Sequence, residues 1–310
     1  MPHAENILII KLGALGDFIQ ALGPMGAIRK HHPDANITLL TTAPFVTFGR
    51  ECGYVDDIIV DTRPKWTQPR KWMALAKSLN AGKFTRVYDL QNNDRTSFYF
   101  SLFKKKPEWV GVAKGASHRN TSPQRTAGHA FDGHVQTLSL AGINDVQIDD
   151  MHWIKGDIDH FALSKPYVLI VPGCAPSRPE KRWPAKNYAD LARTIHGWGY
   201  QPVIIGTEAE KDIAHEICVT LPQAANLAGK TSLTDLVLLA RSASAAIGND
   251  TGPMHLIAPT GCPTHVIFSN ASDPVKHAPK GAAVHIIKGG DLATFSKEDA
   301  ISYIDKESFN

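Results

Sequence analysis

Short apolar runs alternate with segments of helical period along the whole chain. Each run is followed by turn residues and then by a stretch whose apolar positions recur at helical spacing. This alternation is typical of parallel strands buried beneath helices on both faces of a sheet. In the first half the runs predict strands at 7–11, 37–41, 57–60, 86–90 and 109–112. In the second half they predict strands at 167–171, 202–206, 243–248, 264–269 and 283–287.

Two doubly wound α/β domains are the predicted organisation. The chain has 310 residues, of which 43% are hydrophobic, and this is enough to bury two cores of ordinary size. The strand pattern breaks between 142 and 165, where the sequence is acidic and has no clear period. We therefore expect one domain at 1–155 and a second at 156–310.

Charge and cysteine content exclude several classes of protein. The formal net charge is +3, which is too small to indicate a chain that binds nucleic acid over its whole surface. The cysteines lie far apart, without the spacing of a disulfide framework or zinc site, so we expect reduced thiols: Cys52, Cys174, Cys218 and Cys262. The N-terminal stretch lacks a signal-peptide pattern, and no run approaches the ~20 apolar residues of a membrane-spanning helix. We expect a soluble, cytoplasmic protein.

The loops that follow strands are the expected binding sites, because open α/β sheets bind ligands outside the carboxyl ends of their strands. The first such loop reads KLGALGD, with Gly13 and Gly16 suited to a tight turn and Asp17 at the expected helix N-cap. The glycine spacing is neither that of a dinucleotide-binding turn nor that of a P-loop. Asp17 is therefore either a capping residue or a catalytic base.

A second loop, PGCAPSRPEKRWP, follows the strand at 167–171. It combines Gly173, Ser177 and Lys181 with Arg178 and Arg182 before a helix that opens near Pro184. Cations and a hydroxyl beside a glycine turn suit a diphosphate. The alternative is an ordinary solvated basic loop.

A third loop follows the strand at 243–248 and reads NDTGPMH. Asp250 or Thr251 can cap a helix that has Gly252 and Pro253 in its first turn, and the N–H groups of that turn form an anion site. His255 either donates to a phosphate or packs against its neighbours. Capping and phosphate binding are compatible here.

Four motifs in order resemble those of glycosyltransferase family 9, the ADP-heptose:lipopolysaccharide heptosyltransferases. They are KLGALGD, VYDLQNNDRTS, PGCAPSRPEKRWP and GNDTGPMHLIAPTGCP, and the resemblance extends over essentially the whole chain. It implies the GT-B architecture, in which two Rossmann-like domains face each other across a cleft. The N-terminal domain would bind the acceptor and the C-terminal domain the nucleotide-sugar. It further implies an inverting transfer with ADP-heptose as co-substrate, without metal or other cofactor.

The resemblance also assigns roles to single residues. Asp17 would be the base that deprotonates the acceptor hydroxyl, with Gly13 and Gly16 shaping its loop. Donor binding would fall to a set from the second and third loops: Ser177, Lys181, Asp250, Thr251, Gly252 and His255. Two departures concern specificity: Gly13 and Ala14 replace hydroxyl residues frequent in the family, and Pro259 is expected to end the third loop's helix early.

The acceptor that the resemblance implies is an anionic glycolipid of the lipopolysaccharide core at the inner membrane. Basic and aromatic residues gather at 63–72 and 104–120, and they suit either such a headgroup or plain solvent exposure. We expect at most peripheral membrane contact, and no nucleic acid partner. The alternative functions are a GT-B nucleotide-sugar epimerase or hydrolase, and a noncatalytic nucleotide-sugar-binding protein. A dehydrogenase is disfavoured because the glycine fingerprint and its downstream acid do not occur together.

Overall fold

The structure is a computed structural model that describes residues 5–304 and 309. Residues 1–4, where the stretch examined for a targeting signal begins, lie outside this part of the chain. The chain divides into two compact units, Met1–Asp149 (unit 1) and Asp150–Asn310 (unit 2). This division falls inside the predicted connection at 142–165.

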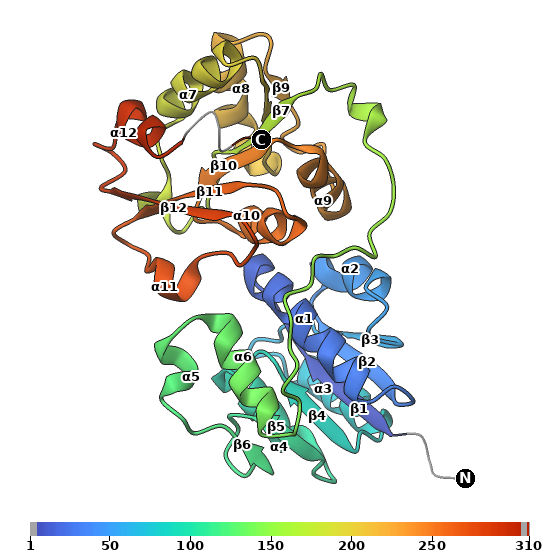
Figure 1. Cartoon of the computed structure of the whole chain (residues 1–310). Coiled ribbons are helices and arrows are strands. Elements are labelled where there is room, and N and C mark those ends of the chain that lie inside the picture. Colours follow the sequence, from blue (N-terminus) through green and yellow to red (C-terminus); the bar gives the residue numbers. More distant parts are fainter. Residues whose placement is uncertain (1–4, 305–308, 310) are drawn as a thin grey trace. The chain divides into compact units, whose positions relative to one another are not determined.

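Unit 1 contains a six-stranded parallel sheet in the order β3-β2-β1-β4-β5-β6 (Figure 1). Its strands are β1 (Asn6–Ile10), β2 (Asn36–Thr41), β3 (Asp57–Val60), β4 (Arg86–Asp89), β5 (Glu108–Gly111) and β6 (His118–Arg119). Its helices are α1 (Leu15–His31), the 3-10 turn η1 (Ala43–Phe45), α2 (Val46–Glu51), α3 (Pro69–Ala81), α4 (Asp94–Leu102), α5 (Gln124–Ala127) and α6 (Ala130–Ser139).

Unit 2 contains a second six-stranded parallel sheet, in the order β12-β11-β10-β7-β8-β9. Its strands are β7 (Tyr167–Val171), β8 (Gln201–Ile204), β9 (Ala225–Asn226), β10 (Ala245–Asn249), β11 (Thr264–Ser269) and β12 (Val284–Gly290). Its α-helices are α7 (Ala185–Gly197), α8 (Lys211–Thr220), α9 (Leu233–Ser242), α10 (Gly252–Ile257), α11 (Pro274–His277) and α12 (Lys297–Ser302). Its 3-10 turns are η2 (Asp159–Phe161), η3 (Pro179–Lys181), η4 (Glu208–Glu210) and η5 (Ala258–Thr260).

The two sheets have the same topology. When the strands of each unit are numbered from its own first strand, both sheets have the order 3-2-1-4-5-6, that of the dinucleotide-binding Rossmann fold. The predicted α/β class with doubly wound parallel sheets is therefore confirmed. Strand order reverses between β1 and β4 in unit 1 and between β7 and β10 in unit 2. Ligands of this fold bind at such switch points, so each unit has one candidate binding site.

The central strands are buried on both faces, which explains their unbroken apolar runs. Every residue of β7 and of β10 is buried, and the same holds for Ile7–Ile10 of β1. Helices cover these faces, so no position along the strand remains for a solvated polar residue. The two-residue strands β6 and β9 were not predicted, since a pattern of period two cannot be recognised in so short a segment.

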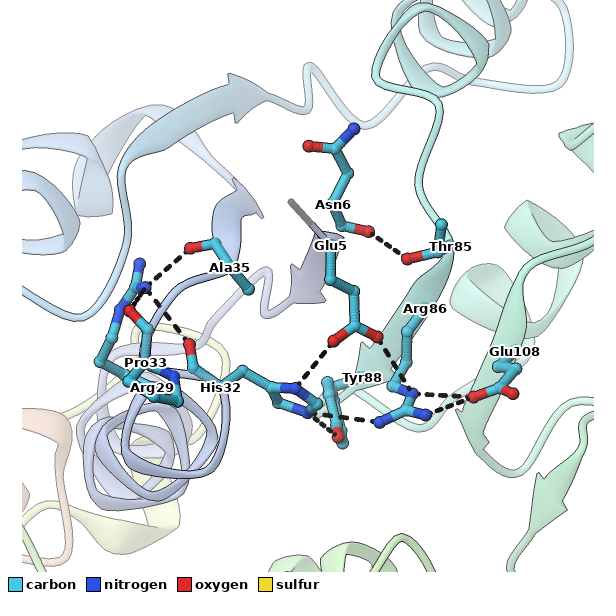
Figure 2. Close-up of polar contacts among 10 residues, drawn as sticks. All are labelled: Glu5, Asn6, Arg29, His32, Pro33, Ala35, Thr85, Arg86, Tyr88 and Glu108. Atoms are coloured by element: carbon cyan, nitrogen blue, oxygen red, sulfur yellow. Dashed lines mark hydrogen bonds and ion pairs between the residues drawn. The ribbon is translucent and has the colours of Figure 1, made fainter. Parts of the chain in front are cut away.

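A polar network closes the amino edge of the unit 1 sheet (Figure 2). Glu5 accepts from His32 through a 2.9 Å contact to Nδ1, and the other ring nitrogen of His32 lies 2.7 Å from the Tyr88 hydroxyl. Arg86, at the start of β4, donates to Glu108 from Nε at 2.9 Å and from Nη2 at 2.6 Å. Burial lowers the pKa of His32, although Glu5 opposes this change. These groups satisfy one another at the edge opposite to the expected binding edge.

Candidate functional site

The switch point of unit 1 holds a buried cation and a buried acid. Lys11 directly follows β1, is 3% exposed, and donates from Nζ to the Leu90 carbonyl at 2.9 Å. Asp89 ends β4 and is fully buried, and its Oδ1 accepts from the backbone N–H groups of Gln91 (3.0 Å) and Asn92 (2.9 Å). Burial raises the pKa of Asp89 to about 6. Burial also lowers the pKa of Lys11, while the charges of Asp17 and Asp89 oppose that change.

Asp17 lies in the first turn of α1 and not at its N-cap, which corrects the sequence expectation. The helix begins at Leu15, and the N-cap is Ala14, which has no side chain able to cap. The Asp17 carboxylate is exposed. Its position in the first turn is favourable for a negative charge, because the N-terminal N–H groups carry partial positive charge.

Gly13, but not Gly16, makes the turn between β1 and α1. Gly13 has a φ of +103°, and a Cβ there would lie 2.5 Å from Cε2 of Phe45. Both the backbone conformation and the space therefore require glycine at this position. Gly16 was expected to turn the chain as well, but it lies within α1 and has no positive φ.

In unit 2, Lys181 and Asp250 come together as an ion pair. Lys181 Nζ lies 2.6 Å from Oδ2 of Asp250, and their side chains are only 16% and 6% exposed. The Ser272 hydroxyl joins both, donating to the same oxygen of Asp250 at 2.6 Å and lying 3.1 Å from Lys181 Nζ. Lys181 ends η3 and Asp250 follows β10, so the structure unites two of the three predicted loops. Ser272, which follows β11, was not predicted.

Asn249 fixes the two loops relative to each other. Its side chain is fully buried at the end of β10. Its Oδ1 accepts from the Trp183 backbone N–H at 3.1 Å and from the Tyr188 hydroxyl at 2.9 Å, while Nδ2 donates to the Pro172 carbonyl at 2.8 Å. The amide thereby uses both its donor and its acceptor to hold the strand end against the neighbouring loop. The sequence signal was the unusual asparagine at the end of an apolar strand.

The other cations of the second loop are engaged elsewhere. Arg178 donates to Glu180 at 2.5 Å and to the Ala271 carbonyl at 3.0 Å, and Arg182 donates to the Cys174 carbonyl at 3.4 Å. Ser177 is exposed in the same loop. Of the predicted cations, Lys181 is therefore the one that the described structure directs at Asp250.

The remaining predicted residues lie on or beside α10. Thr251 is the N-cap, as expected, but its side chain makes no capping hydrogen bond. Gly252 opens the helix, and His255 lies half-buried within it. The α-helix has six residues and ends at Ile257, so its macrodipole is small. The N-terminus of α10 is therefore a weaker candidate for binding an anion than the Lys181 ammonium group.

A pocket of about 500 Å³ adjoins this ion pair at the carboxyl ends of β11 and β12. Its walls include Ser269, Asn270, Ser272 and Lys288. Ser272 therefore belongs both to the pocket and to the ion-pair group. Ligand pockets in proteins commonly have about this volume.

The two predicted basic and aromatic patches have different outcomes. In the first, Trp66 is 69% exposed and stacks on Trp72 at 5.1 Å between ring centroids, and Phe98 packs edge-on against both. Arg95 lies 5.6 Å from the Trp72 ring centroid. In the second, Trp109 is fully buried in the core of unit 1. Trp109 belongs both to this patch and to the strand predicted at 109–112, and β5 confirms the strand and places Trp109 in the core, away from the patch.

The described part of the chain contains neither a candidate metal cluster nor a helix that could span a membrane. Within 5–304 and 309, no group of three or more His, Cys, Asp or Glu side chains is placed to hold a metal ion. No helix in the same residues has the length and apolar character needed to cross a bilayer.

Comparison with known proteins gives a consistent set of relatives. A model of glycosyltransferase family 9 (heptosyltransferase) matches residues 72–303. Lipopolysaccharide heptosyltransferase 2 of Salmonella typhimurium is 33% identical over 140 residues, which are 42% of this chain and 39% of that protein. The chain thus spans about two fifths of the length of this curated relative.

Solved structures match over nearly the whole chain. A family 9 glycosyl transferase from Veillonella parvula has a TM-score of 0.84 at 21% identity, covering 100% of this chain and 98% of that one. ADP-heptose LPS heptosyltransferase II of E. coli has a TM-score of 0.77 at 19% identity, with 98% of each chain covered. At these identities the structures establish the fold, and the family model establishes the membership. The chain, with its two Rossmann-like units and its Lys181–Asp250 pair at a switch point, belongs to glycosyltransferase family 9, the heptosyltransferases.

Proposed function

We propose that this protein is an inverting, metal-independent glycosyltransferase that moves heptose from ADP-heptose to an inner-core acceptor of lipopolysaccharide. Family membership supports the reaction class, and the names of the relatives support the substrates. The observation that carries the proposal is the Lys181–Asp250–Ser272 group at the switch point of unit 2. It offers a fixed cation for a diphosphate, together with oxygen atoms for sugar hydroxyls.

The donor binds to unit 2 in this proposal. Lys181 contacts the diphosphate, and its ammonium group stabilises the negative charge that grows on the leaving ADP. Its side chain is 16% exposed, so the interaction is poorly screened by solvent. Asp250 binds a sugar hydroxyl, because a carboxylate beside the phosphates would be repelled. Ser177, Thr251, Gly252 and His255 complete the donor site from the loops on either side.

Asp17 of unit 1 acts as the general base. Its carboxylate accepts the proton of the acceptor hydroxyl while the hydroxyl oxygen forms a bond to the anomeric carbon of the donor. The bond from that carbon to the diphosphate breaks in the same step, and ADP leaves with the electron pair. Attack from the face opposite to the leaving group inverts the anomeric centre. The exposure of Asp17 suits a group that must reach a macromolecular acceptor.

The acceptor binds to unit 1, and the Trp66–Trp72–Phe98 cluster provides part of its surface. The segment 62–88 contains seven lysines and arginines and no acidic residue: Arg63, Lys65, Arg70, Lys71, Lys77, Lys83 and Arg86. Cations with exposed aromatic rings suit the anionic headgroup of a glycolipid in the cytoplasmic face of the inner membrane. The protein would then act in the cytoplasm with peripheral membrane contact.

Mass spectrometry of reaction products tests the proposal. Purified protein is incubated with ADP-heptose and truncated lipopolysaccharide acceptors, and we expect an acceptor product heavier by one heptose, together with ADP. Incubation with donor alone separates the rivals: free heptose or an altered nucleotide-sugar formed without acceptor would indicate a hydrolase or epimerase. Binding without any product would indicate a noncatalytic binding protein.

A further inference from the structure

The turn within the motif VYDLQNNDRTS lies at the switch point of unit 1 but has no part in the proposed reaction. The motif spans the end of β4, this turn and the start of α4. Asp89, which is fully buried, accepts at Oδ1 from the backbone N–H groups of Gln91 (3.0 Å) and Asn92 (2.9 Å). From β1, Lys11 donates to the Leu90 carbonyl at 2.9 Å. Two buried side chains therefore fix the backbone that carries Gln91.

Gln91 connects this turn to the loop that precedes Asp17. Its side-chain Oε1 accepts from the backbone N–H of Leu12 at 2.9 Å, although the two residues are 79 positions apart in sequence. The Leu12 carbonyl is held from the other side of β1, where the Thr42 hydroxyl donates at 3.1 Å and Arg63 Nη2 at 2.6 Å. These side chains follow β4, β2 and β3, the strands that lie on either side of β1 in the sheet. Both polar backbone groups of Leu12 are thus bound by side chains distant in sequence.

The start of α1 depends on these contacts because the helix has no side-chain cap. Its N-cap is Ala14, which has no side-chain group that could bond to the first turn. Gly13, with a φ of +103°, is the single residue between Leu12 and this N-cap, and glycine restricts the backbone least. The Leu12 backbone is therefore the nearest anchored point before the turn of α1 that carries Asp17.

We propose that Gln91 is a positioning residue for Asp17, because it fixes the Leu12 backbone from which α1 starts. The proposal rests on the proposed function, in which Asp17 is the general base. A base must lie within hydrogen-bond reach of the proton that it accepts, and a displacement of about 1 Å can slow a reaction ~10²-fold. Loss of the contact between Gln91 and Leu12 should therefore slow the chemical step. Donor binding, which is assigned to unit 2, should not change.

Two substitutions remove the contact in different ways. Gln91→Met keeps the length of the side chain but not its oxygen, and kcat should fall about 10–100-fold. KM for both substrates and the affinity for ADP should stay unchanged, as measured by steady-state kinetics and calorimetry on the full chain. Gln91→Asn keeps an amide but is one methylene too short to reach Leu12. It should show the same loss of kcat, and it tests the proposal even if the methionine variant fails to fold.

Gln201→Met is the matched control. Gln201 is a half-buried glutamine at the start of β8, and its Oε1 accepts from the backbone N–H of Ser164 at 2.7 Å. The substitution removes the same kind of hydrogen bond as Gln91→Met, but at the amino edge of the unit 2 sheet. It should lower Tm about as much as Gln91→Met and leave kcat unchanged.

Gln91→Glu separates positioning from direct contact with the acceptor. A carboxylate oxygen can accept from the Leu12 N–H, whereas both donors of the amide are lost, so kcat at the pH optimum of the variant should return close to the parental value.

Unchanged kcat in folded Gln91→Met or Gln91→Asn would overturn the proposal. A raised KM for the acceptor, or a Gln91→Glu variant that does not recover kcat, would overturn it in favour of direct contact. A parent chain that forms no product, or parental turnover in Asp17→Asn, would instead contradict the proposed function, and this inference would fall with it.

Discussion

The two switch points of this protein share a topology and differ in how their charges are held. In unit 1, Lys11 is buried and donates to a backbone carbonyl, Asp89 is buried at the end of the neighbouring strand β4, and Asp17 is exposed in the helix that follows β1. In unit 2, the cation Lys181 and the acid Asp250 are joined directly at 2.6 Å. The same strand order thus presents an accessible carboxylate in one unit and a fixed cation in the other.

In the proposed reaction, this difference would let the same fold serve two substrates. An accessible carboxylate can accept a proton from a bulky acceptor, whereas an ammonium group fixed by Asp250 and Ser272 gives a defined contact for a diphosphate. Changes at the unit 1 switch point should therefore affect mainly turnover. Changes at the unit 2 switch point should affect mainly donor binding.

The largest effect is expected for Asp17→Asn. The variant keeps the size of the side chain but removes the carboxylate that accepts the proton, so turnover should fall by ~10²–10⁴-fold while donor affinity and Tm stay unchanged. Steady-state kinetics with saturating donor, together with calorimetry, measures both. Asp94→Asn, an exposed acid in the first turn of α4, is the matched control. If Asp17→Asn transferred sugar at nearly the parental rate with chemistry rate-limiting, Asp17 would not be the base.

Lys181→Ala should weaken the binding of ADP. Loss of a charge-assisted contact costs roughly 1.5–3 kcal/mol, which corresponds to about 10–150-fold in Kd. Asp250, 6% exposed, would also lose its cationic partner and repel the phosphates. The double variant Lys181→Ala/Asp250→Asn should therefore regain part of the affinity. Lys186→Ala, an exposed lysine in the first turn of α7, serves as control. If folded Lys181→Ala bound ADP with the parental affinity, Lys181 would not contact the diphosphate. The loop would then be an ordinary solvated basic loop.

Asp89→Asn should alter how stability depends on pH. Burial raises the pKa of Asp89 to about 6, above its value in the unfolded chain. Between about pH 4 and pH 6 the folded protein therefore keeps a proton on Asp89 that the unfolded chain has released. The contribution of this carboxyl to stability is lost as pH rises through that window. Relative to the parent, the variant should therefore gain about 1–3 kcal/mol between about pH 4.5 and pH 7. Urea unfolding of variant and parent at both pH values measures the difference in their free energies of unfolding. If that difference were the same at pH 4.5 and pH 7, Asp89 would not have the raised pKa.

The smallest effect is expected for Glu108→Gln, at the edge of the unit 1 sheet where the strands begin. This edge lies opposite to the carboxyl edge at which substrates are proposed to bind. Glu108 accepts from Arg86, and its side chain is 52% exposed, so Glu108→Gln should cost under about 1 kcal/mol. Thermal unfolding and steady-state kinetics should show a slightly lower Tm and an unchanged kcat/KM. A large loss of turnover at unchanged Tm would mean that the two edges of this sheet are not functionally distinct.

The sequence by itself determined the fold class and the loops that matter. Apolar runs bounded by turns are local signals, and ten strands of the two sheets were placed within three residues at each end. The central strands, such as β7 and β10, are the clearest because burial on both faces leaves no exposed position in them. The glycine turn at Gly13 and the helix opening beside Pro184 were also readable, since both depend on backbone chemistry close in sequence.

Only the tertiary structure decided which of the predicted groups meet. Lys181, Asp250 and Ser272 are far apart in sequence, and their contact depends on the strand order that places β10 between β7 and β11. The contacts of Asn249 with Tyr188 and Pro172 depend on the same packing. Patterns along a chain report the preference of each segment for water or for a core. Contacts between side chains depend instead on how the segments are arranged in space, which no single segment encodes.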